Sequence, residues 1–69
     1  MTPTEDAYAN VNRMKPMKGE SAEDFANRMY SMQMEVFSAW AGHDLFTPFF
    51  TLPKKVQNGW IEKAKEKMS

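Results

Sequence analysis

Two breaks that contain both glycine and proline divide this 69-residue chain into three segments of helical character. The first break runs from Lys15 to Gly19, where Pro16 disfavours helical geometry at the residue before it and the glycine tolerates a positive φ. The second begins at Gly42 and contains Pro48. Because these breaks interrupt any continuous helix, the chain is limited to short helices that pack against one another.

Each segment opens on a recognisable helix start. Thr2 is placed as an N-cap, with Pro3 at the first helical position and Glu5 completing a capping box. Ser21 is a second hydroxyl cap, followed at the third position by a carboxylate. Leu52-Pro53 opens the last segment. These signals predict helices over about 3–14, 22–41 and 53–68, with a short helical turn in the connection between the second and the third.

The pattern of apolar residues indicates an all-α fold. One face of segment 22–41 is apolar at helical spacing, whereas the opposite face is polar, as in an amphipathic helix. No segment alternates apolar and polar residues with β-branched enrichment. The sequence therefore predicts a single three-helix domain over residues 1–69, with the second helix longest and an aromatic-rich connection after it.

Composition removes several classes of function. The chain has no cysteine, which excludes a disulfide framework, a thiolate metal site and a nucleophilic thiol. Nine basic and nine acidic residues give zero net charge, which argues against broad electrostatic capture of nucleic acid. The polar start and the lack of an apolar stretch of about 18 residues predict a cytoplasmic protein with no membrane partner.

No residue pattern indicates catalysis. His43 stands beside Asp44, but no serine nucleophile is tied to them by a motif. The carboxylates lie on polar helix faces without metal-ligand spacing, and the glycines are too isolated to form a phosphate-binding loop. We therefore expect no catalytic residue, no metal site, no cofactor and no enzymatic activity.

The aromatic and methionine residues are the most informative side chains. Most of the large aromatic residues are expected to form the core where the second and third helices meet, namely Trp40, Phe46, Phe49, Phe50 and Trp60. Tyr30 and Met34, four residues apart, border the polar side of the second helix. A small core is least able to cover this pair and the aromatic connection, so the candidate partner-binding residues are Tyr30, Met34, Phe46, Phe49 and Phe50.

The C-terminal lysines offer an alternative. Residues 45–69 carry five basic and two acidic residues, net +3, whereas residues 1–44 carry four basic and seven acidic residues, net −3. Lysines on a terminal helix mostly solvate it and complement the negative end of its dipole. Phosphate contact is the alternative function, and the residues that would make it are Lys54, Lys55, Lys63, Lys65 and Lys67.

The stretch from Leu52 to Ala64 resembles a pattern found in many small bacteriophage proteins, in which an aromatic residue, Leu-Pro, a Gln and a Trp precede an Ala-containing terminal helix. In this chain Leu52-Pro53, Gln57 and Trp60 carry the resemblance. It implies a phage or prophage accessory protein in the host cytoplasm, with no catalytic residues to transfer. The leading hypothesis is thus a non-catalytic interaction module that binds and modulates a host protein. The alternatives are a nucleic-acid-associated accessory protein and a self-assembling, homo-oligomeric helical subunit.

Overall fold

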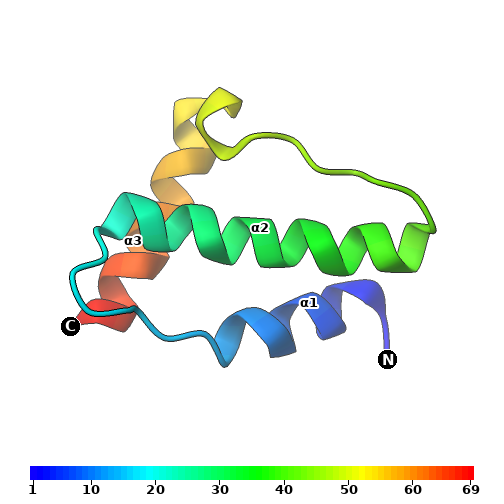
Figure 1. Ribbon diagram of the computed structural model, residues 1–69, viewed down its shortest axis with the longest axis horizontal. Coiled ribbons are helices and arrows are strands. Elements are labelled where there is room, and N and C mark those ends of the chain that lie inside the picture. Colours follow the sequence, from blue (N-terminus) through cyan, green and yellow to red (C-terminus); the bar gives the residue numbers. More distant parts are fainter.

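A computed structural model describes all residues from Met1 to Ser69 and confirms the all-α prediction. Helix α1 spans Pro3–Asn12, α2 spans Ala22–Ala41 and α3 spans Lys54–Met68. A single turn of 3₁₀ helix, η1, spans Phe49–Thr51 in the connection before α3. The predicted helical turn is therefore present in the aromatic connection (Figure 1).

The helix ends follow the local chemistry of the sequence. The backbone N–H of Glu5 donates to the Thr2 hydroxyl oxygen at 3.2 Å, and the Thr2 N–H donates to the Glu5 carboxylate at 3.2 Å, completing the capping box. Ser21 accepts from the N–H of Asp24 at 3.1 Å. Gly42 ends α2 in the left-handed region with φ 78°. These contacts satisfy N–H groups that the first turn leaves unpaired.

Two boundaries differ from the prediction by one or two residues. Helix α1 ends at Asn12 because the next residues form a tight turn, in which the N–H of Met14 donates to the Val11 carbonyl at 3.0 Å. Helix α3 begins at Lys54, since Pro53 has extended geometry and its carbonyl oxygen accepts the first bonds of the helix. Proline has no N–H to donate, but at the start of a helix this N–H would have no partner within the helix, so no hydrogen bond is lost.

The three helices form two contacts that share α2 (Figure 1). Helix α1 runs antiparallel alongside α2, and α3 passes behind the N-terminal half of α2 at a steep angle (Figure 1). The connection after α2 runs back along that helix to η1 (Figure 1). The radius of gyration is 12.0 Å, slightly above the roughly 11 Å of a compact chain of this length. The molecule is elongated and measures 34 × 25 × 18 Å along its principal axes.

The core lies where all these elements meet. Its buried side chains come from α1, α2, η1 and α3 and are Val11, Phe25, Ala26, Met29, Tyr30, Phe49 and Ala64. The Tyr30 ring lies 5.6 Å from the Phe49 ring and 6.1 Å from the Trp60 ring, between centroids. Tilted and edge-to-face aromatic pairs of this kind add to the free energy gained by burial.

The predicted aromatic core is confirmed for Phe49 and Trp60, and Phe50 joins the cluster at its exposed edge, whereas Trp40 and Phe46 lie outside it. Trp40 is 49% exposed, Phe46 50% and Phe50 58%. Helix α3 crosses only the N-terminal half of α2, so it cannot cover a residue at the opposite end of that helix (Figure 1). Trp40 instead donates its indole N–H to Asp6 of α1 at 2.9 Å.

Candidate interaction surfaces

The residues predicted to face a partner fall into a buried and an exposed group. Tyr30 is 5% exposed and Phe49 1%, so their placement on an outward surface is wrong. Tyr30 lies at the centre of the aromatic cluster, where it contacts both Phe49 and Trp60. Met34 is half-buried and packs against the core. Only Phe46 and Phe50 remain exposed among the predicted residues.

Leu45 is exposed as well, and we call these three exposed apolar side chains of the segment before α3 the connection surface, defined as Leu45, Phe46 and Phe50. Their backbone is held by local hydrogen bonds, since the N–H of Leu45 donates to the Ser38 hydroxyl at 2.9 Å. The N–H of Phe46 donates to the Asp44 carboxylate at 2.9 Å. Phe50 packs edge-on against Phe49, with 5.1 Å between ring centroids. The connection surface is therefore apolar and locally anchored.

The Gln57 side chain holds the end of this connection. Its burial was not predicted from the sequence. Its side chain is almost completely buried, and its amide donates to the Leu52 carbonyl at 2.8 Å and to the Phe50 carbonyl at 3.3 Å. A buried amide is stable only when hydrogen-bonded, and here it donates to one carbonyl within η1 and one just after it. The clue in the sequence was a glutamine on the apolar face of α3.

A cleft of about 270 Å³ lies elsewhere on the molecule. All three helices contribute to it, and we call it the lysine cleft after its two cationic residues. Its lining is half hydrophobic and consists of Tyr8 and Val11 from α1, Gln33 from α2, and Lys55, Val56, Gly59, Trp60 and Lys63 from α3. The site could not be predicted from the sequence, because its residues lie on faces of three helices. These faces come together only when α1 and α3 pack against α2.

The five lysines of the proposed phosphate-binding helix do not act as one group. Lys67 donates from its ammonium to the carbonyls of Asn12 at 3.1 Å and Met14 at 3.2 Å. These carbonyls lie at the C-terminal end of α1, where a cation complements the helix dipole. Lys65 lies 4.0 Å from the Glu62 carboxylate. Two of the five lysines therefore have partners within the chain.

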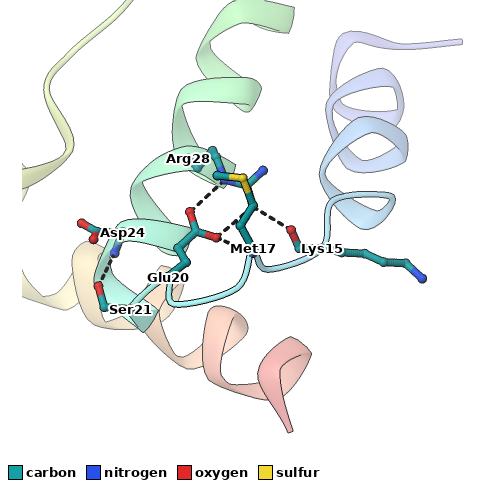
Figure 2. A network of polar contacts seen from close by, with 6 residues as sticks. All are labelled: Lys15, Met17, Glu20, Ser21, Asp24 and Arg28. Atoms are coloured by element: carbon teal, nitrogen blue, oxygen red, sulfur yellow. Dashed lines mark hydrogen bonds and ion pairs between the residues drawn. The ribbon is translucent and has the colours of Figure 1, made fainter.

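The connection between α1 and α2 is held by a network of charged hydrogen bonds (Figure 2). The Arg28 guanidinium donates to both oxygens of the Glu20 carboxylate at 2.9 Å and to the Lys15 carbonyl at 2.6 Å. Glu20 also accepts from the N–H of Met17 at 3.0 Å. The guanidinium carbon lies 5.1 Å from the Phe25 ring centroid, within cation–π range. Arg28 therefore joins the connection to both α2 and the core.

This network changes the acidity of Glu20. The hydrogen bond from Arg28, together with that from the Met17 N–H, lowers the pKa of Glu20 from 4.5 to about 2. The same carboxylate raises the pKa of Arg28. Both shifts favour the charged forms, so the pair stays ionised well into acid. We regard this network as a structural clamp and call it the Glu20–Arg28 clamp.

Three further observations about this chain are negative. No group of three or more His, Cys, Asp or Glu side chains is placed to hold a metal ion. None of the helices combines the length and the apolarity that crossing a membrane requires. In comparisons with known proteins, no family model, no curated protein and no solved structure matches this chain.

Proposed function

We propose that the protein is a non-catalytic interaction module that binds another protein through the connection surface. The observation that carries this proposal is the exposure of Phe46 and Phe50 on a locally anchored backbone. Fully burying a Phe side chain is worth about 1.5–3 kcal/mol, so covering two half-exposed rings supplies roughly 1 kcal/mol from each. A partner that covers both rings would remove from water apolar surface that the fold itself leaves exposed.

The proposal that the partner is a host protein rests on the resemblance of the C-terminal stretch to small phage proteins. The residues that carry this resemblance have structural roles here, since Leu52 and Trp60 pack against the core and Gln57 is buried. These residues attach α3 to the rest of the fold, and they identify no target. The nucleic-acid alternative is less favoured, because Lys65 and Lys67 are engaged within the chain.

The proposal is tested by comparing two variants that each remove exposed apolar groups. The double variant Phe46→Ser with Phe50→Ser removes both rings of the connection surface. Met17→Ser removes an exposed side chain from the other connection and serves as the control. Each protein is immobilised and exposed to bacterial lysate, and the retained proteins are quantified. We expect the double variant to lose about tenfold or more of a specific retained protein and the control to keep it.

Folding and self-association are measured on the same samples. Circular dichroism must show that the double variant keeps its helical signal, so that loss of capture reports the surface. Equal retention by all three proteins would contradict binding through the connection surface. A sedimentation experiment in which wild type is a dimer and the double variant a monomer would favour the self-assembling alternative instead.

A further inference from the structure

We propose that the lysine cleft binds an acidic segment of a partner protein, in which one large apolar side chain enters the cleft and carboxylates on either side pair with Lys55 and Lys63. The lysine cleft shares no residue with the connection surface. The two proposals are therefore tested separately, and this one goes beyond the function proposed above.

The cleft is wide enough and apolar enough to hold one large side chain. Val11 is a buried lining residue, while Val56 and the 57%-exposed Tyr8 are open to solvent. Trp60 adds a second aromatic ring. The volume of about 270 Å³ exceeds the roughly 150 Å³ that suffices for a benzene ring in an engineered protein cavity. The cleft thus has room for one aromatic or branched aliphatic side chain.

A glycine forms part of the wall of the cleft. Gly59 lies within α3, where glycine is less stable than alanine. Its φ is not positive, and an added Cβ would meet no atom within 4 Å. Neither backbone conformation nor close packing therefore requires glycine here. Because glycine has no side chain, this part of the cleft is open.

The charge at the cleft is positive. Lys55 and Lys63 are its only charged lining residues, and neither takes part in an ion pair of the chain. They are eight residues apart on α3, which corresponds to about 12 Å along the helix axis. In an extended segment, residues four positions apart are separated by about 13 Å. An apolar residue with a carboxylate two positions before it and another two positions after it matches this spacing.

The same features favour a protein over a nucleic acid. Single-stranded nucleic acids bind to grooves that offer several cations along the backbone and a series of stacking rings. The lysine cleft offers two cations and space for one ring. Gln33 and Tyr8 belong to the same lining, and an amide and a hydroxyl are side-chain groups that can hydrogen-bond to the backbone of an extended peptide. We therefore assign the lysine cleft to an acidic peptide segment.

The probe is a blocked pentapeptide with glutamate at both ends, phenylalanine in the centre and serine between them. It is titrated into ¹⁵N-labelled protein, and the indole N–H signals of the two tryptophans are followed by NMR. Trp60 lies in the cleft, whereas Trp40 is bonded to Asp6 elsewhere and serves as an internal reference. We expect the Trp60 signal to shift and the Trp40 signal to stay, with a dissociation constant on the order of 0.1–1 mM.

Control peptides separate the two parts of the recognition. Replacing both glutamates by glutamine should weaken binding about fivefold, as expected for two exposed ion pairs. Replacing the phenylalanine by alanine should weaken it about tenfold or more. A single-stranded oligonucleotide that shifts Trp60 more strongly than the acidic peptide would overturn the proposal in favour of nucleic acid.

Protein variants test whether the cleft itself is the site. Gly59→Leu fills the cleft while improving helix propensity, and we expect it to weaken binding at least tenfold. Gly59→Ala is its matched control and should keep binding within about threefold of wild type. In the double variant Lys55→Gln with Lys63→Gln, the acidic peptide should no longer bind more tightly than the control peptide that carries glutamine in place of both glutamates. The pair Lys54→Gln with Lys65→Gln, with the same change in charge, should retain this preference for the acidic peptide.

Three further results would overturn the proposal. They are unchanged binding to a folded Gly59→Leu variant, equal loss of preference in both lysine pairs, and the absence of any Trp60 shift up to several millimolar peptide. Should Gly59→Leu not fold, the two lysine pairs still decide the outcome, because surface lysine substitutions leave stability nearly unchanged. Loss of a wild-type dimer on Gly59→Leu substitution would assign the cleft to self-association and also contradict the proposal.

Discussion

The two connections of this molecule are held in different ways. The connection between α1 and α2 is fixed by the Glu20–Arg28 clamp, whose partners are a carboxylate and backbone groups. The connection between α2 and α3 is fixed mainly by one aromatic residue, Phe49, which is buried, and by the amide of Gln57. In the Glu20–Arg28 clamp the polar groups find their hydrogen-bond partners within the chain. An aromatic anchor leaves the neighbouring rings Phe46 and Phe50 uncovered.

This difference shows why the second connection is the better candidate for binding. Charged hydrogen bonds are directional, and once Arg28 has bonded to Glu20 and Lys15 little remains for a partner to add. Apolar burial has no such saturation, because each exposed ring still gains free energy when it leaves water. A helical chain of this size has too little core to cover three phenylalanines in one short segment, so it buries only Phe49.

The largest expected effect comes from the anchor of the second connection. Phe49→Ala should lower the free energy of unfolding by about 3–5 kcal/mol, because it empties a fully packed site against Tyr30. Phe46→Ala, a few residues away, should change it by less than about 0.5 kcal/mol. Urea unfolding followed by circular dichroism measures both. Similar losses from the two variants would contradict the division between one anchor and exposed neighbours.

The glycines at the two connections should respond alike. Gly19 has φ 80° and Gly42 has φ 78°, a region in which a Cβ is strained. We expect Gly19→Ala and Gly42→Ala each to cost about 1–2 kcal/mol, although nothing crowds the added methyl at either site. Thermal unfolding of both variants tests this. A neutral Gly42→Ala would mean that the second connection relaxes where the first does not.

Breaking the clamp should have a smaller effect on stability. Arg28→Ala removes the bonds to Glu20 and Lys15 and the contact with Phe25, and we expect a loss of about 1 kcal/mol after allowing for a guanidinium one-third exposed. Arg28→Lys keeps the charge but loses the two-pronged geometry, so it should recover only part of that stability. Full recovery with lysine would show that charge alone holds the connection.

The smallest expected effect depends on pH. Because the pKa of Glu20 is lowered from 4.5 to about 2, its contribution to stability is complete above about pH 4.5 and is lost as the pH falls towards 2. The difference in melting temperature between wild type and Glu20→Gln should therefore narrow over this range. Thermal unfolding at several pH values between 7 and 2 measures it. A difference independent of pH would contradict an ionised Glu20 in the clamp.

The helices themselves were determined by the sequence. Their starts at Thr2 and Ser21 and the end at Gly42 depend on hydrogen bonds and backbone preferences within about four residues, and such short-range interactions are visible in a single chain. Periodicity likewise predicted an apolar face on segment 22–41, and Phe25 and Met29 of this segment are buried. The 3₁₀ turn after Pro48 follows from the same local restrictions.

The tertiary structure decided which aromatic side chains are buried. Tyr30 and Trp40 both lie on α2, yet Tyr30 is in the core and Trp40 is half exposed, because α3 crosses only one half of that helix. The lysine cleft and the bonds of Arg28 likewise join residues that no fixed spacing relates. Periodicity gives each helix an apolar face, but the crossing angle and position of its neighbours decide how much of that face is covered.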